Sequence, residues 1–279
     1  MHEKKTLKIL TYNIQVSIPM EGAHHYFLRS WRHFLPHEGR LVNLKDIADV
    51  LKNYDLVGLQ EVDAGSMRSS FINQVSYLGK EAGFLCWEVQ VNRDLKFYAQ
   101  HANGILSRVP MSHYQDHKLP AKIPGRGVMT CLIGPVEKQI LVAVAHLSLT
   151  ENAQEEQLNY IANLIKDAPH VIVMGDLNIE PDKLKKFFLD KTGLILNLPK
   201  LPTYPSWKPT RKIDYVLTSP SLKIKKAEVL LLPYSDHLPV AVEIEWPESF
   251  RDQANTDTEF QALAEQWVKA AMAYSAKQS

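Results

Sequence analysis

The stretch Val171-Ile-Val-Met-Gly-Asp-Leu-Asn178 decides how this chain is organised. Its apolar first half predicts a strand that is buried on both faces. Gly175 then lets the backbone turn or come close to another group. Asp176 and Asn178 follow two residues apart, so in an extended segment their side chains point the same way. This pairing indicates a metal or phosphate site, although Gly, Asp and Asn are also common in plain turns.

Three other apolar runs also end in polar side chains. They are residues 7–12, 56–59 and 140–145, followed by Asn13, by Gln60-Glu61 and by His146. Parallel and mixed sheets carry their sites at strand ends, where several elements bring polar groups to one point. The recurrence therefore favours one shared site over four separate turns.

Composition places the chain among ordinary globular proteins. It has 279 residues, of which 45% are hydrophobic and 23% charged, and this length suits one large domain or two small ones. The net charge of +1 provides no overall field that would hold nucleic acid. Lysine and arginine gather in the later half of the chain. They form either a solvated face or a surface for an anionic ligand. The two cysteines, Cys86 and Cys131, lie in apolar runs and indicate buried thiols in a reducing compartment.

The two ends of the chain bear on location and domain boundaries. No apolar signal segment follows the N-terminus and no stretch is long enough to span a bilayer, so we expect a cytoplasmic protein. Export without a cleaved signal would leave no trace of this kind. Residues 1–247 are predicted to form one domain, with residues 248–279 as an amphipathic helix that docks on it. The alternatives are that this helix binds a partner or contacts a membrane surface.

Strand and helix patterns alternate along the chain and predict an α/β fold. Short turns between several strands indicate that the sheets are not all parallel. Expected strands are 7–13, 55–61, 84–91, 103–108, 128–133, 139–147, 171–174, 213–217 and 240–246. Expected helices are 43–54 capped by Asn43, 71–82, one from Thr150 to about 168, and one that Pro181 opens.

Two loops have a composition that suggests a role. Residues 18–40 are rich in aromatics and histidines and predict a packed lid or a wall of the substrate site. His33 and His37 have a spacing that allows a zinc site, but no further ligand lies at a suitable spacing. In the loop 122–127, Arg126 is a candidate for holding a phosphate, and a plain hairpin turn is the alternative.

Seven short motifs occur in a fixed order along the chain. They are Thr11-Tyr-Asn13, Gln60-Glu-Val62, Asn103-Gly-Ile-Leu-Ser-Arg108, His146-Leu147, Gly175-Asp-Leu-Asn178, Ile213-Asp-Tyr215 and Ser235-Asp-His237. Each is weak alone, but the ordered set resembles the endonuclease/exonuclease/phosphatase superfamily, the DNase I-like hydrolases, over roughly residues 7–246. The resemblance implies a four-layer α/β/β/α sandwich of two mixed β-sheets with outer helices, and metal-dependent phosphoester hydrolysis.

Three of the polar residues suit a hard divalent cation. Phosphodiesters resist hydrolysis because their anionic oxygens repel a nucleophile, so this charge must be neutralised and a water molecule activated. Glu61 is an oxygen ligand of the kind that Mg²⁺ or Mn²⁺ prefers. Asn13 and Asp236 can help to hold the ion, directly or through water.

The other motif residues suit catalytic roles, which the superfamily resemblance also implies. Asp176 can orient or deprotonate the attacking water, and Asn178 can hold Asp176 or a phosphate oxygen. His237 can donate to the phosphate, while Asp214 receives its other ring N–H and favours the charged ring. His146 can donate to a non-bridging oxygen or assist the leaving group. One or two metal ions, and either Asp or His as the base, remain open alternatives.

The substrate is less well defined by the sequence. Asn103, Arg126 and Trp207 are the candidate substrate-binding residues, and an aromatic such as Trp207 could stack on a base or pack against a lipid or sugar. A phosphodiesterase, with nucleic acid among its substrates, is the first expectation. A lipid or inositol-phosphate hydrolase is the alternative, and a binding protein that has lost catalysis is the third. Neither inositol-phosphatase motifs nor the inserted basic helices of a duplex-DNA endonuclease are recognised.

Overall fold

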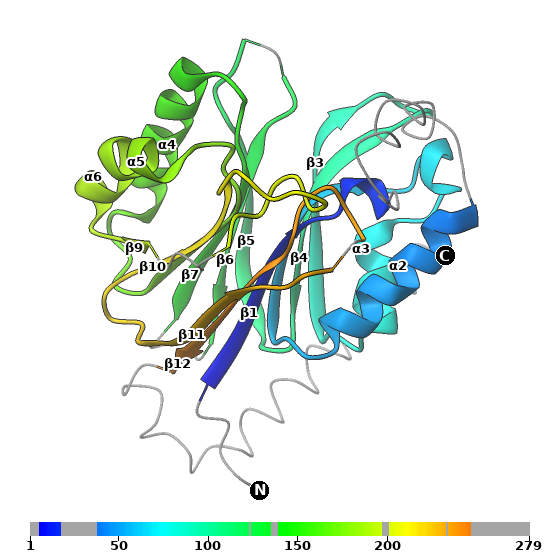
Figure 1. Cartoon of the computed structure of the whole chain (residues 1–279), viewed down its shortest axis with the longest axis horizontal. Helices are drawn as coiled ribbons and strands as arrows, with labels where there is room; N and C mark the ends of the chain where they lie inside the picture. Colours follow the sequence, from blue (N-terminus) through cyan, green and yellow to red (C-terminus); the bar gives the residue numbers. More distant parts are fainter. Residues whose placement is uncertain are drawn as a thin grey trace, which may run out of the picture.

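The computed structural model describes residues 6–17, 38–122, 124–134, 139–196, 201–232 and 234–246. Two six-stranded mixed β-sheets pack face to face, with helices outside them (Figure 1). This arrangement confirms the expected α/β sandwich. The predicted C-terminal helix, and with it the division at residue 247, lies outside the described residues, as does most of the loop 18–40.

The first sheet has the order β11-β12-β1-β2-β4-β3. Its strands are β1 (Thr6–Asn13), β2 (Leu56–Asp63), β3 (Cys86–Asp94), β4 (Gln100–Ser107), β11 (Ile224–Val229) and β12 (Val240–Glu245). Strands β1 and β2 are parallel, and the other neighbours are antiparallel. Helices α2 (Glu38–Leu51) and α3 (Gln74–Glu81) cover its outer face (Figure 1).

The second sheet has the order β5-β6-β7-β8-β10-β9. Its strands are β5 (Met111–Lys118), β6 (Gly127–Ile133), β7 (Ile140–His146), β8 (Val171–Asp176), β9 (Ile195–Leu196) and β10 (Asp214–Thr218). Here β7 and β8 form the parallel pair. Its outer face is covered by α4 (Glu151–Ile165), α5 (Pro181–Leu184), a π-helical turn (Lys185–Leu189) and α6 (Asp190–Thr192).

The main core lies between the two sheets. Ile9 and Leu56 of the first sheet meet Val142 and Met174 of the second, and all four are essentially inaccessible to solvent. Two further cores fill the space between each sheet and its helices. Every residue of β8 is buried, as its continuous apolar run predicts. This packing fixes the strand ends relative to one another.

Three strands and one helix start differ from expectation. Strands β5 and β11 are not predicted, because both are edge strands rich in exposed polar residues and therefore lack the apolar pattern of a buried strand. Strand β9 is not predicted either, because its two residues are too few to form a pattern. Helix α2 begins at Glu38, so Asn43 does not cap it. The side-chain amide of Asn43 instead donates to the carbonyl oxygen of Tyr234.

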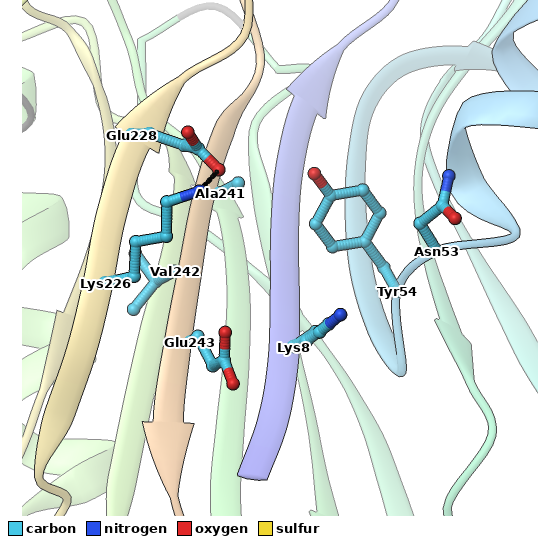
Figure 2. A pocket seen from close by; sticks show the side chains of 8 residues that line it. All are labelled: Lys8, Asn53, Tyr54, Lys226, Glu228, Ala241, Val242 and Glu243. Atoms are coloured by element: carbon cyan, nitrogen blue, oxygen red, sulfur yellow. Dashed lines mark hydrogen bonds and ion pairs between the residues drawn. The ribbon is translucent and has the colours of Figure 1, made fainter.

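Charged side chains gather on the outer face of β11, β12 and the start of β1. A pocket of about 120 Å³ lies there, and Figure 2 shows Lys8, Tyr54 and Glu243 among its lining residues. The ion pair of Lys226 with Glu228 (Nζ to Oε1, 2.6 Å) is exposed to solvent, and such pairs contribute little to stability. Within the described part of the chain, no helix has the length and apolar character needed to cross a membrane.

Candidate active site

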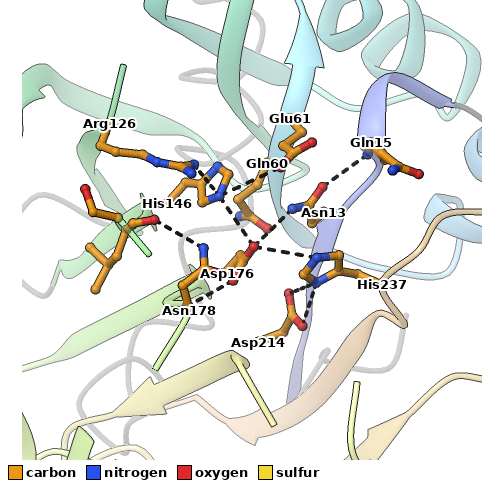
Figure 3. Close-up of polar contacts among 12 residues, drawn as sticks. Asn13, Gln15, Gln60, Glu61, Arg126, His146, Asp176, Asn178, Asp214 and His237 are labelled. Carbon is orange, nitrogen blue, oxygen red and sulfur yellow. Dashed lines mark hydrogen bonds and ion pairs between the residues drawn. The ribbon is translucent and has the colours of Figure 1, made fainter. Parts of the chain in front are cut away.

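Strand register brings the predicted site residues side by side. The parallel pairing of β7 with β8 sets His146 beside Asp176, and the antiparallel pairing of β8 with β10 sets Asp214 on the other side of Asp176. In the opposite sheet, the register of β1 with β2 sets Asn13 beside Gln60. Figure 3 shows these side chains from both sheets converging on Asp176.

Gly175 is required for this convergence. Its φ of 143° is in the region that favours glycine, and a Cβ atom there would lie 1.9 Å from the carbonyl oxygen of Ala145. No side chain can occupy that space, because the neighbouring atom is backbone. Glycine therefore allows β8 to approach β7 closely at the point where Asp176 enters the site.

Asp176 is buried and, among the described residues, is held by two hydrogen bonds. The side-chain amide of Asn13 donates to Oδ2 and the backbone N–H of Asn178 donates to Oδ1, each at 3.1 Å. Burial raises the pKa of Asp176 to about 7, and the nearby charges of Asp214 and Glu61 add to this. A carboxyl group with that pKa can accept a proton near neutral pH.

His237 is held as a charged ring. Its Nδ1 lies 3.0 Å from Oδ2 of Asp214, which also accepts a hydrogen bond of 2.6 Å from the Thr203 hydroxyl. Burial lowers the pKa of His237, but Asp214, Asp176 and the other carboxylates outweigh this and hold it well above its usual value. The remaining nitrogen, Nε2, lies 3.8 Å from Oδ2 of Asp176. The sequence does not predict the role of Thr203, because Thr203 lies in a loop and no sequence pattern links it with Asp214.

His146 and Arg126 form a second pair at the site. Arg126 Nη1 donates to His146 Nε2, because a guanidinium has no acceptor. Burial lowers the pKa of His146 well below its usual value, and the positive charge of Arg126 adds to the effect. His146 Nε2 also lies 3.4 Å from Oδ2 of Asp176 and 3.9 Å from Oε1 of Glu61. In this arrangement Nε2 of His146 accepts a hydrogen bond, and the N–H groups that point into this part of the site are those of Arg126.

Glu61 reaches the site through an irregularity in β2. Its φ is 53°, and the pairing of β2 with β4 shifts register between Leu59 and Val62. Backbone in this region is strained for a residue other than glycine, and such strain often marks a functional position. The Glu61 side chain is 37% exposed, whereas its neighbour Gln60 is buried and bonded to Thr11.

Carboxylates outnumber the cations available to balance them. Burial raises the pKa of Asp236 to about 6, and Glu61 and Asp214 raise it further. Within the described residues, ligand atoms of Asp176, Asp214 and His237 all lie within 4.8 Å of one another. The charged ring of His237, however, is committed to Asp214 and makes a poor metal ligand. The oxygens of Glu61, Asp236 and Asn13 are the donor set that fits a hard divalent cation.

Asn178 does not project beside Asp176 as expected. Its φ of 53° breaks the extended conformation, and its side-chain amide donates to the carbonyl oxygen of Leu147 at 3.2 Å (Figure 3). Only its backbone N–H holds Asp176. The expectation of two parallel side chains was therefore wrong, because β8 ends at Asp176.

A cleft of about 1070 Å³ leads away from the site. It extends from Glu61 and His146 past Arg126 to the first turn of α4. Asn103 lines it, and its role in binding substrate stays a prediction. Trp207 is half-buried on a neighbouring loop and is not among the described residues that line the cleft, so its role stays a prediction.

Comparison with known proteins places the chain in a family. A model of the endonuclease/exonuclease/phosphatase family matches residues 10–237. The chain belongs to this family. Its members are hydrolases that act on phosphoester bonds and typically depend on a divalent metal. The predicted superfamily is thereby confirmed, and no curated protein sequence matches the chain.

Several solved structures share the fold. A family member from Beutenbergia cavernae is 20% identical, with a TM-score of 0.67, over 88% of this chain and 72% of its own. The mannosyl-6-phosphatase Bt3783 of Bacteroides thetaiotaomicron is 17% identical, with a TM-score of 0.65, over 86% of this chain and 100% of its own. Truncated Caenorhabditis elegans TDP2 is 15% identical, with a TM-score of 0.60, over 86% of this chain and 98% of its own. At these identities the likeness establishes the fold alone.

Proposed function

We propose that this protein is a Mg²⁺- or Mn²⁺-dependent phosphodiesterase, with nucleic acid among its candidate substrates. The observation that carries the proposal is Asp176, a buried carboxyl group with a pKa raised to about 7 that lies between a charged histidine and an arginine-bound one. A group with that pKa, in contact with cationic donors, suits deprotonation of a water molecule beside a phosphate.

The metal ion would be held by Glu61, Asp236 and Asn13. When bound, it would neutralise phosphate charge and lower the pKa of a coordinated water. The hydroxyl of Ser235 supports this ligand set, because it donates to the carbonyl oxygen of Asn13 at 2.7 Å and precedes Asp236. The two segments that carry these ligands are therefore tied together.

Asp176 would act as the base and His237 as the main cationic donor. Both oxygens of Asp176 accept hydrogen bonds, so its carboxylate is fixed in orientation. His237 keeps its proton on Nδ1 through Asp214 and directs Nε2–H toward the same region as Asp176. A charged ring there stabilises the negative charge that develops on the phosphate oxygens.

Arg126 takes the donor role that the sequence assigns to His146. The neutral ring of His146 accepts from Arg126 and so orients the guanidinium beside Asp176. The other N–H groups of Arg126 can then bind a non-bridging phosphate oxygen. His146 is a positioning residue in this scheme.

A lipid or inositol-phosphate hydrolase is the second candidate. The observation that favours it is an exposed aromatic cluster, in which the rings of Phe71 and Phe97 lie 5.4 Å apart and those of Phe97 and Tyr98 lie 5.8 Å apart. These residues are 56–66% exposed, and Phe97 and Tyr98 join the two strands that line the cleft. Exposed apolar clusters commonly mark contact surfaces. Co-sedimentation with phosphatidylcholine vesicles, lost on Phe97→Ser, would support this candidate.

The deciding experiment combines activity with metal binding. Wild type should hydrolyse bis-4-nitrophenyl phosphate with Mg²⁺ or Mn²⁺ and stop when EDTA is added. Glu61→Ala should lose both this activity and the heat of Mg²⁺ binding in a calorimetric titration. Glu81→Ala, which removes an exposed carboxylate on α3, is the matched control and should change neither. Equal activity and metal affinity in wild type and Glu61→Ala would refute the proposal.

A further inference from the structure

The inner face of β4 presents two polar side chains to the cleft. His101 and Asn103 are two residues apart on this strand and line the cleft together. Ile105, the next residue on that face, belongs to the core between the sheets, while Ala102 packs toward the helices. Both polar side chains therefore lie at the mouth of the space between the two sheets.

The orientation of the Asn103 amide is fixed. Gln90 Nε2 donates to Oδ1 of Asp116 at 2.6 Å and to the carbonyl oxygen of Val128 at 3.0 Å, which leaves its own oxygen as an acceptor. Asn103 Nδ2 must therefore donate to Gln90 Oε1, at 3.1 Å, and it also bonds the carbonyl oxygen of Gly127 at 3.2 Å. A flipped amide would set oxygen against oxygen at both contacts.

This orientation leaves one acceptor without a donor. Asn103 is 1% exposed, and its Oδ1 has no hydrogen-bond partner among the described residues. A buried acceptor that stays unpaired is costly, so such atoms are normally satisfied by water or by a ligand. Oδ1 is itself buried, and since Asn103 lines the cleft, the cleft is the space from which a donor would approach it.

The tautomer of His101 is fixed in the same way. Arg68 Nη1 lies 3.4 Å from His101 Nε2, and Arg68 Nε donates to Oδ2 of the buried Asp63 at 2.5 Å. A guanidinium only donates, so Nε2 of His101 is the acceptor and the ring proton is on Nδ1. Burial lowers the pKa of His101 to about 4, and the charge of Arg68 contributes, so the ring is neutral.

We propose that His101 and Asn103 form a two-point subsite for the organic part of the substrate, with His101 Nδ1–H as donor and Asn103 Oδ1 as acceptor. This rests on the proposed phosphoester hydrolysis. The matching ligand group carries an acceptor and a donor close together, as the hydroxyls of a sugar or a nucleoside do. Choline and acyl chains have no donor and cannot satisfy Asn103.

Two substrates with the same leaving group test this subsite. They are the 4-nitrophenyl ester of thymidine 5′-phosphate, which carries hydroxyl and ring N–H groups, and 4-nitrophenyl phosphocholine, which carries no donor. Wild type should have a higher kcat/KM for the thymidine ester. His101→Leu should reduce this preference about five- to tenfold, the loss expected for one neutral hydrogen bond. His101→Asn, which restores a nitrogen donor at the position of Nδ1, should recover part of it.

His117→Leu is the matched control, because His117 is a half-buried histidine on β5 that does not line the cleft. It should leave the preference unchanged. Competitive inhibition by mannose 6-phosphate would identify a free sugar phosphate as the source of the hydroxyls. Lack of inhibition by mannose 6-phosphate would identify a nucleoside as their source. An unchanged preference in His101→Leu would overturn the subsite.

A spectroscopic measurement separates this proposal from the proposed function. Nitrogen-15 chemical shifts should show His101 as the neutral Nδ1–H tautomer at pH 7, and mannose 6-phosphate or thymidine 5′-phosphate should shift its signals. An Nε2–H tautomer, or signals that neither ligand moves, would overturn the subsite. If neither ester is hydrolysed while these signals respond as expected, the proposed reaction fails and the binding subsite stands.

Discussion

Asp63 and Asp176 occupy equivalent places in the two sheets and have opposite properties. Asp63 is the last residue of β2, Asp176 is the last residue of β8, and neither is more than 1% exposed. Burial raises the pKa of both carboxyl groups. In Asp63, however, hydrogen bonds from Ser66 and the charge of Arg68 outweigh burial and lower its pKa to about 2, while that of Asp176 is about 7.

The difference is in the donors that the fold supplies. Asp63 accepts from the backbone N–H groups of Gly65 and Ser66, from the hydroxyls of Ser66 and Ser69, and from Arg68. From the described part of the chain, Asp176 accepts only two hydrogen bonds. The charge of Asp63 is thus neutralised within the protein and stabilises a loop. The charge of Asp176 is not neutralised in this way and remains available to a ligand, a proton or a cation. Such a buried, incompletely neutralised carboxylate is typical of a functional site.

The largest contrast should appear in catalysis. Asp176→Asn should lower kcat by roughly 10³- to 10⁴-fold on bis-4-nitrophenyl phosphate, because it removes the base. It should keep the fold, since the amide has the size of the carboxyl group and loses one of its two hydrogen bonds: its oxygen can accept from Asn13 or from the backbone N–H of Asn178, but not from both. Steady-state kinetics and circular dichroism measure the two effects. Residual activity within tenfold of wild type would show that another residue is the base.

Asp63→Asn should act mainly on stability. Removing the negative charge leaves Arg68, which is 3% exposed, as an uncompensated buried cation, at a cost of about 3 kcal/mol in the free energy of unfolding. Urea denaturation measures this loss, and a double mutant with Arg68→Met should recover part of it. On bis-4-nitrophenyl phosphate, the rate per folded molecule should stay within about threefold of wild type. A larger fall would place Asp63 in the reaction itself.

The pH dependence of stability should separate the same two carboxyl groups. In the metal-free protein the folded-state pKa of Asp176 is raised to about 7, so its contribution is fully present below about pH 4 and is lost as pH rises through 7. The stability of Asp176→Asn relative to wild type should therefore rise between pH 5 and 8. The lowered pKa of Asp63 works in the opposite direction, and its contribution is lost only as pH falls toward about 2.

The difference between variant and wild type removes the contributions of groups whose pKa does not depend on Asp176, and it reports Asp176 together with its effect on His237. His146 and His101 have lowered pKa values and stabilise the folded protein increasingly as pH rises, which masks the trend in wild type alone. Urea denaturation of both proteins in EDTA at several pH values gives the difference. A difference that does not change with pH would mean that Asp176 is already ionised at pH 5.

The smallest effect concerns Thr203, which supports the site from outside. Thr203→Val removes the hydrogen bond to Asp214 and should cost about 1 kcal/mol of stability. It should also lower kcat about fivefold, because Asp214 orients His237. Thr130→Val is the matched control, since Thr130 is a buried threonine bonded to His117 away from the site. The two variants should lose similar stability. If Thr203→Val and Thr130→Val had equal kcat values, Thr203 would have no role in supporting the site.

Much of the site follows from local sequence. The run from Val171 to Met174 forms a buried strand that ends in Gly175 and Asp176, and the same pattern places His146 at the end of β7. Hydrophobic periodicity predicts these elements because the strands are buried between layers. Edge strands such as β5 and β11 escape prediction because half of their surface faces water and carries polar residues.

The sequence by itself determined which residue types stand at the ends of the buried strands, because side-chain alternation and apolar runs are local properties of the chain. It singled out Asp176 through its motif, but it could not show that Asp63 and Asp176 have pKa values shifted in opposite directions. The tertiary structure alone decided that Ser66, Ser69 and Arg68 surround the first carboxylate. The second instead faces Glu61, His146 and His237. A pKa depends on every charge and donor within a few ångströms, and those neighbours come from segments that only folding brings together.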